Sequence, residues 1–170
     1  GLDLVEWVME RLLTSRVQLV IIGTGDPRYE NLFRYYEWTR KGQVSANILF
    51  NETRAHRVYA AADAMLMPSR FEPCGLTQLI SLRYGTVPIV RETGGLRDTV
   101  QPYNRFEQTG TGFSFANYNA DEMLNTIFYA EQVFYDEPDA WKAMVERGMT
   151  KDYSWTASAK IYEELYDSLL

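Results

Sequence analysis

The sequence predicts an α/β fold: a doubly wound parallel sheet followed by a helical C-terminal tail. Short apolar runs alternate along the chain with longer segments in which apolar residues recur at helical spacing. Buried parallel strands have continuous apolar sequences, whereas amphipathic helices show the longer period. Glycine or proline ends several of the runs, as expected where strands give way to loops. Because crossovers between parallel strands are right-handed, helices would cover both faces of the sheet.

The chain begins directly in a helical pattern, without Met. Its first apolar residues share one face, and they are Leu4, Val5, Val8, Leu12 and Leu13. A helix without a lead-in indicates that a strand and a loop precede it in a longer parent protein. We therefore expect residues 1–170 to be a single domain that lacks its own first strand and loop.

Five strands are predicted from the apolar runs, at residues 17–22, 48–50, 64–67, 87–90 and 112–115. Three helices connect the first four strands. They are recognised by apolar residues at helical spacing: Tyr29, Leu32, Phe33 and Tyr36, then Ala55, Val58, Tyr59 and Ala62, then Leu76, Leu79 and Ile80.

The last third of the chain is predicted to be helical. Asn119, followed three positions later by Glu122, resembles a capping box. Pro138 suits the first turn of a second helix, and Ser154 could cap a third. The third helix carries an apolar face of Ile161, Tyr162, Leu165, Tyr166 and Leu169. We expect it to fold back on its own domain or to mediate self-association.

Composition excludes several function classes. The net charge of −6 argues against a general nucleic-acid binder, which needs a basic surface. A single cysteine, Cys74, excludes an internal disulfide framework and suits a reducing cytoplasm. The sequence shows no apolar run of membrane-spanning length and no signal peptide. We therefore expect a cytoplasmic protein with no nucleic-acid partner, no membrane partner, no metal and no cofactor.

Three loops follow predicted strands, and ligands of such sheets bind at the carboxyl ends of strands. The loops are residues 23–26 (GTGD), 69–77 (SRFEPCGLT) and 93–96 (TGGL). The first loop is neither a phosphate-binding Walker loop nor a dinucleotide fingerprint, and taken alone it is better explained as a plain turn. Glycine turns at successive strand ends nevertheless predict a single phosphate-binding crevice.

Glu72 places a carboxylate just before Gly75 and a predicted helix start. It is either a functional group or a residue that complements the helix dipole. Cys74 is expected to be packed and inert, because the lone His56 belongs to a different helix.

Two long segments resemble bacterial glycogen synthases and plant starch synthases: SRFEPCGLTQ at 69–78 and GTVPIVRETGGLRDTV at 85–100. The resemblance extends to DYSW at 152–155 and covers essentially the whole chain. It implies a GT-B enzyme of two Rossmann-like domains, of which residues 1–170 would be most of the C-terminal, nucleotide-sugar-binding one. The N-terminal domain would be missing.

The activity implied by the resemblance is transfer of glucose from ADP-glucose to the non-reducing end of an α-1,4-glucan (glycogen), with retention. Glu72 matches the catalytic glutamate that holds the donor glucose beside the reacting carbon. Phe50 falls at the position of an aromatic residue against the adenine, although core packing at a strand end would also explain it. The other donor-binding positions implied are Gly23, Thr24, Ser69, Arg70, Cys74, Gly75, Leu76, Thr77, Thr93, Gly94 and Gly95.

One position departs from the wider superfamily, in which a second glutamate grips the nucleotide ribose. In this chain the position of that second glutamate is Ile80, and glycogen and starch synthases commonly lack the glutamate too. The residue that contacts the ribose is therefore unassigned, and Gln78 lies nearby in the sequence. The resemblance also places the catalytic arginine and lysine in a loop before Gly1, and the acceptor groove in the other domain. We therefore expect the isolated chain to be inactive. The alternatives are a GT-B enzyme that uses UDP-glucose and a non-catalytic nucleotide-binding module.

Overall fold

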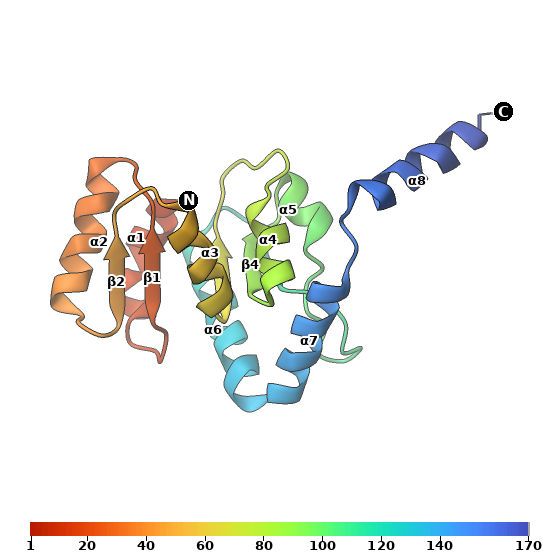
Figure 1. The fold of residues 1–170 in the computed structure, drawn as a ribbon. Coiled ribbons are helices and arrows are strands. Elements are labelled where there is room, and N and C mark those ends of the chain that lie inside the picture. The colour runs from red at the N-terminus through yellow and green to blue at the C-terminus, as the bar shows by residue number, and fades with distance from the viewer. Residues whose placement is uncertain (170) are drawn as a thin grey trace.

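The computed structural model describes residues 1–169, which form eight helices and five strands that alternate as far as the sixth helix, with two further helices after it (Figure 1). The predicted α/β fold is confirmed. In chain order the elements are α1 (Leu2–Leu12), β1 (Leu19–Ile22), α2 (Pro27–Thr39), β2 (Val44–Asn47), α3 (Glu52–Ala61), β3 (Ala64–Met67), α4 (Thr77–Tyr84), β4 (Val87–Arg91), α5 (Gly94–Thr99), β5 (Phe113–Phe115), α6 (Ala120–Asp136), α7 (Pro138–Thr150) and α8 (Trp155–Asp167).

The strands form two parallel sheets rather than the single sheet expected from the sequence. β1 pairs with β2, with Leu19 opposite Val44. The second sheet has the order β3-β4-β5, with Ala64 opposite Val87 and Ile89 opposite Phe113. Within residues 1–169, no strand pairing joins β1 to β3. All the strands nevertheless run in the same direction, so their carboxyl ends share one edge of the molecule (Figure 1).

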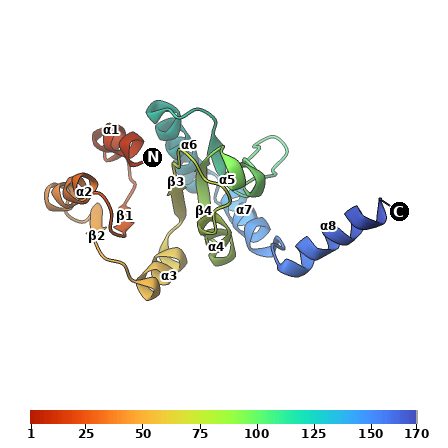
Figure 2. The same cartoon turned by 90° about the horizontal axis from the view of Figure 1, so that it is seen from above.

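Helices cover both faces of the two sheets, as predicted. α1 packs against α6 on one side, and α3 packs against α4 on the other (Figure 2). The predicted apolar face of α1 is buried in the main core together with α6 and β4. β4 is the most deeply buried strand, since Val87, Pro88, Ile89 and Val90 are all inaccessible.

The second strand lies earlier than predicted, at Val44–Asn47 instead of 48–50. β2 is an edge strand that pairs only with β1, so Ser45 and Asn47 are tolerated in it although parallel strands are usually apolar. The chain then turns, with the Leu49 amide donating to the carbonyl of Asn47. Phe50 follows the turn with 90% of its surface exposed, so core packing at a strand end is wrong for this residue.

The buried face of α4 also differs from the prediction. Gln78, Ser81 and Leu82 are buried, whereas Leu76 precedes the helix and is 68% exposed. Leu82 packs against α7, where Gly148 provides room for its side chain, whereas Gln78 reaches Thr99 of α5. Apolar periodicity missed this face because two of its three residues are polar.

The predicted helix starts of the C-terminal third are confirmed, but only half of the capping box forms, because Glu122 accepts from the amide of Asn117 and the Asn119 amide donates to the Asn117 carbonyl. The Asn119 side chain accepts hydrogen bonds from the amides of Asp121 and Glu122, Pro138 occupies the first turn of α7, and the Ser154 hydroxyl accepts from Ala157. α8 contains no buried residue and extends away from the rest of the molecule (Figure 1). The expectation that it folds back on its own domain is therefore wrong, because nothing in the described part of the chain lies within reach of its apolar face; self-association stays a prediction.

None of the helices in residues 1–169 combines the length and the apolar character needed to cross a bilayer.

Candidate functional site

The candidate site lies at the common carboxyl edge of the strands. The loops after β1, β3 and β4 all emerge there (Figure 1). The loop from Ser69 to Leu76 leads from β3 into α4, and Glu92 and Thr93 lead from β4 into α5. This is the edge at which ligands of open α/β sheets bind.

Two of the predicted segments pack directly against each other. The backbone at Glu72 and Cys74 lies so close to Gly94 and Gly95 that a Cβ would not fit. A Cβ on Gly94 would collide with the carbonyl oxygen of Glu72, and one on Gly95 with that of Cys74. Gly94 also has φ of +44°, a backbone conformation that favours glycine. The glycine pair is therefore needed to bring the two loops together.

The buried side chain of Gln78 holds the loop before α4 through hydrogen bonds. Its side chain is inaccessible, and Nε2 donates to the carbonyl oxygens of Cys74 at 2.9 Å and Gly75 at 2.8 Å, with Thr99 Oγ1 at 3.2 Å. Gly75 can follow this path because it adopts φ of +74°. These bonds leave Gln78 unsuited to the ribose contact considered from the sequence. No pattern in the sequence distinguishes such a buried glutamine from an exposed one.

Arg91, which sequence reasoning missed, ties β4 to the same loop. Its Nη1 donates to the carbonyl oxygens of Arg70 at 2.9 Å and Ser69 at 3.4 Å. The guanidiniums of Arg70 and Arg91 both lie over the Tyr118 ring, at 5.5 and 5.6 Å from its centroid. The site therefore contains a pair of cations. Arg91 was missed because it directly follows the apolar run of a predicted strand.

Tyr118 connects this arginine pair to α1. Its hydroxyl donates to Asp3, the second residue of that helix. Burial raises the pKa of Tyr118 to about 12, with the hydrogen bond to Asp3 and the charge of that carboxylate adding to the effect. The same hydrogen bond lowers the pKa of Asp3. The phenol is therefore neutral at physiological pH and holds the start of α1 against the site.

The helix N-termini at the site lack side-chain caps. Neither Leu76 before α4 nor Thr93 before α5 makes a cap hydrogen bond, whereas Asp26, Asn51 and Asn119 cap α2, α3 and α6. Uncapped amides at a helix start are available to an anion. The Glu72 carboxylate makes no hydrogen bond or ion pair to the described residues, and the alternative that it complements the helix dipole stays a prediction.

The loop after β1 differs from the other two. Asp26 accepts from the Arg28 amide and Glu30 accepts from the Gly25 amide, so carboxylates already occupy the start of α2. Gly23 has φ of +146°, and its amide donates to the Asn47 carbonyl. Thr24, between these groups, is exposed.

Cys74 is exposed rather than packed as expected. The loop in which it lies is held through its backbone, so its side chain needs no place in the core. His56 lies on α3 and contacts Tyr84 through Nδ1, at 2.9 Å from the hydroxyl. The structure thus brings together the predicted positions from Ser69 to Thr77 and from Thr93 to Gly95. Gly23 and Thr24 follow β1 and Phe50 precedes α3 after β2, so these three lie at the carboxyl end of the other sheet.

Comparison with known proteins identifies relatives along the entire chain. The family model for "Glycosyl transferases group 1" matches residues 1–140. A glycogen synthase of Lachnospira eligens is 62% identical over 169 residues, which are 99% of this chain and 35% of that protein. A glycogen synthase of Clostridium acetobutylicum is 54% identical over 170 residues, covering 100% of this chain and 36% of that protein.

The catalytic domain of starch synthase IV from Arabidopsis thaliana, solved with ADP and acarbose, superimposes with a TM-score of 0.85. It is 33% identical and covers 99% of this chain and 35% of that one. The resemblance to glycogen and starch synthases is therefore confirmed, and residues 1–170 span about a third of the length of these relatives.

Proposed function

The chain belongs to the group 1 glycosyl transferases, and from this we propose that it is the donor-binding domain of a longer glycogen synthase. The proposed enzyme transfers glucose from ADP-glucose to the non-reducing end of an α-1,4-glucan, with retention at the anomeric carbon. The glycogen synthases among the relatives support the reaction, and the ADP bound to starch synthase IV supports an adenine nucleotide donor.

The observation that carries the proposal is the close packing of the loop at Glu72 and Cys74 on the Gly94–Gly95 turn. The packing brings the backbone of Glu72 against the start of α5, in the loop that leads into α4, and neither helix start has a side-chain cap; this supports a role for the Glu72 carboxylate beside the two helix starts. A departing nucleoside diphosphate gains negative charge, which preorganised amides stabilise. A carboxylate at the same place is suited to accept hydrogen bonds from the hydroxyls of a sugar.

Each part of the chain has a proposed role. Glu72 holds the donor glucose, and the backbone from Cys74 to Thr77 contacts sugar and phosphate. Thr93, Gly94 and Gly95 hold the diphosphate, with Ser69 and Arg70 beside them. Gly23 and Thr24 lie beneath the diphosphate, and Phe50 stacks on adenine. In this scheme binding relies on amides and arginines, so we propose that the cytoplasmic enzyme needs no metal or cofactor.

Kinetics of the longer protein test the role of Glu72. Replacing Glu72 with Gln should lower kcat strongly while leaving the affinity for ADP unchanged, because the carboxylate is assigned to glucose and not to nucleotide. Glu107→Gln, in an exposed turn outside the site, is the matched control. Equal turnover of Glu72→Gln and the unmodified enzyme would contradict the assignment.

Donor competition tests the substrate. ADP-glucose should be used in preference to UDP-glucose, and the reverse order would favour a UDP-sugar enzyme. Residues 1–170 alone should bind ADP weakly and transfer no glucose. Weak ADP binding with no turnover by the longer protein would instead favour a non-catalytic nucleotide-binding module.

We also propose that the exposed face of α8 associates with a second copy when the chain is isolated, since large exposed apolar surfaces favour such contacts.

A further inference from the structure

Tyr118 contacts two parts of the candidate site that lie far apart in the sequence. The guanidiniums of Arg70 and Arg91 lie over its ring, and Arg70 belongs to the loop that carries Glu72. The Tyr118 hydroxyl donates to the carboxylate of Asp3, in the first turn of α1. One side chain therefore joins the loop of the candidate donor site to the start of α1.

The backbone on both sides of Tyr118 is held by hydrogen bonds. Before it, the carboxylate of Glu122 accepts from the amide of Asn117 at 2.9 Å and from the side-chain amide of the same residue. After it, Asn119 caps α6 by accepting from two amides of the first turn. Tyr118 itself is half-buried and packs against the main core. The fold therefore presents its hydroxyl from a turn whose path is already set.

Few polar contacts hold the start of α1. Gly1, its N-cap residue, makes no side-chain cap hydrogen bond. Asp3 has two partners among the described residues, the Tyr118 hydroxyl and the amino group of Gly1 at 3.5 Å. That amino group becomes a peptide nitrogen once a residue precedes Gly1. In the longer protein Tyr118 is then the remaining one of these two partners.

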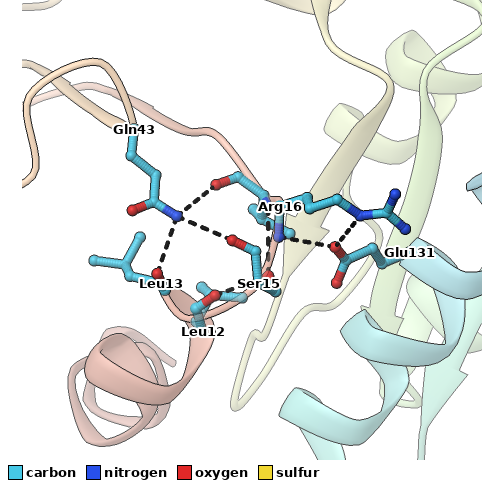
Figure 3. Close-up of polar contacts among 7 residues, drawn as sticks. Leu12, Leu13, Ser15, Arg16, Gln43 and Glu131 are labelled. Carbon is cyan, nitrogen blue, oxygen red and sulfur yellow. Dashed lines mark hydrogen bonds and ion pairs between the residues drawn. The ribbon is translucent and has the colours of Figure 1, made fainter.

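The opposite end of α1 is held without Tyr118 (Figure 3). Gln43 Nε2 lies 3.1 to 3.2 Å from three carbonyl oxygens in the turn after the helix, those of Leu13, Ser15 and Val17. In the same turn the Arg16 amide donates to Glu131 of α6 at 3.0 Å. Loss of the Tyr118 hydrogen bond should therefore loosen only the beginning of α1.

The beginning of α1 lies against the loop that carries Glu72. A Cβ on Gly1 would collide with the carbonyl oxygen of Pro68, which directly follows β3 and leads into that loop. Two residues later, the Arg70 carbonyl accepts from Arg91 at 2.9 Å. The N-terminus lies at this carboxyl edge of the strands (Figure 1). A residue joined to Gly1 in a longer protein therefore enters α1 at the candidate donor site.

We propose that Tyr118 is a positioning residue of the transfer reaction. Through Asp3, its hydroxyl holds the start of α1 and the residues joined to Gly1 against the loop that carries Glu72. Its ring supports the same loop through Arg70. The two segments are thus kept at a fixed separation, and small displacements of catalytic groups are costly. This inference rests on the proposed function, since it needs a transfer reaction at this loop.

Kinetics of the longer protein test the inference. Tyr118→Phe keeps the ring and loses only the hydroxyl, so kcat should fall on the order of 10-fold. KM for the glucan should stay unchanged, because the hydrogen bond lies at the donor edge. Asp121→Ala is the matched control: it removes another tie to α1, the ion pair with Arg11 at 2.7 Å near the far end of the helix. This control should leave kcat unchanged.

A double-mutant cycle tests whether Tyr118 acts through Asp3. Asp3→Ala should lower kcat at least as much as Tyr118→Phe does. The double variant should be no slower than Asp3→Ala alone, because both changes remove the same hydrogen bond. Losses that add in the double variant would overturn the inference, and so would an unchanged kcat in Tyr118→Phe.

Amide hydrogen exchange reports on the start of α1 without any reaction. The amides of Leu4 and Val5 donate to the Gly1 carbonyl at 3.2 and 3.4 Å, and they should exchange faster in Tyr118→Phe. The amide of Leu13, at the far end, should be unaffected. Unchanged exchange of Leu4 and Val5, or faster exchange with unchanged kcat, would refute this inference and leave the proposed function intact. Absence of glucosyl transfer by the unmodified longer protein would refute the proposed function, and this inference with it.

Discussion

Arg91 Nη1 donates to the carbonyl oxygen of Arg70 over 2.9 Å, so the last residue of β4 holds the loop that carries Glu72. Arg91 touches main chain and not the expected position of the sugar. It is therefore a positioning residue: its guanidinium holds the start of this segment, which Gln78 holds at Cys74 and Gly75 and which the contact of Arg70 with Tyr118 also supports.

Replacing Arg91 with Lys keeps the charge and loses the guanidinium, whose Nη1 donates to the carbonyls of both Ser69 and Arg70. In the longer enzyme kcat should fall by roughly 10- to 100-fold, since small displacements of a catalytic group are costly. KM for the glucan should stay unchanged. Arg97→Lys, at an exposed site on α5, is the matched control. A change in KM alone would place Arg91 outside the positioning of Glu72.

Gly94→Ala should disrupt the packing of the two loops. Alanine at φ of +44° is strained, and its Cβ would collide with the Glu72 carbonyl, so we expect a loss of roughly 1–3 kcal/mol in the free energy of unfolding. ADP affinity should fall at the same time. Denaturant unfolding and titration calorimetry measure the two effects. Gly25→Ala is the control, because a Cβ there meets no atom within 4 Å. Equal stability of the two variants would show that the glycine pair is not required.

Local patterns predicted most of the fold. The third and fourth strands, the apolar face of α1 and the Asn119 cap follow from apolar runs and from side chains that bond to nearby amides. β2 was missed because an edge strand needs little apolar character. The division of the strands into two sheets could not be predicted from the sequence, because the pairing of strands is a long-range property.

The candidate site was likewise predicted only in part, from local sequence and not from long-range contacts. Its glycine loops and Glu72 were found from local sequence and from resemblance. Arg91 and Gln78 were not, because their roles depend on carbonyls brought near by the fold: Arg91 reaches back to the loop after β3, and Gln78 turns inward to Cys74. A charged residue ending a strand and a glutamine beginning a helix have no distinctive spacing.

Tyr118→Phe should change how stability depends on pH. The pKa of Tyr118 in the folded chain is about 12, above the ordinary value of 10, so the neutral phenol stabilises the folded state fully below pH 10. That contribution is lost as pH rises from 10 to 12. The difference in unfolding free energy between the unmodified chain and Tyr118→Phe should therefore be constant from about pH 5 to pH 10 and shrink above pH 10. It should also shrink at acid pH, where protonation of Asp3 removes the charge that accepts the hydrogen bond. Tyr166→Phe, on the exposed α8, controls for loss of a phenol. A difference that stays constant up to pH 12 would contradict the Tyr118–Asp3 interaction.

Phe50→Ala tests whether the exposed ring contacts the nucleotide base. The side chain is 90% exposed, so its removal should leave the Tm unchanged, because little packing is lost. If the ring stacks on adenine, ADP affinity should weaken by about 1–3 kcal/mol, the usual value of a base–aromatic stack. Phe106→Ala is the matched control, since that ring is 96% exposed in the turn between α5 and β5.

Titration calorimetry on the longer protein, with ADP and then with adenosine, separates base contacts from phosphate contacts. The two ligands should lose the same free energy on Phe50→Ala, because the ring would touch only the part they share. Unchanged affinity for both would remove Phe50 from the donor site, and a loss confined to ADP would place it near the diphosphate instead.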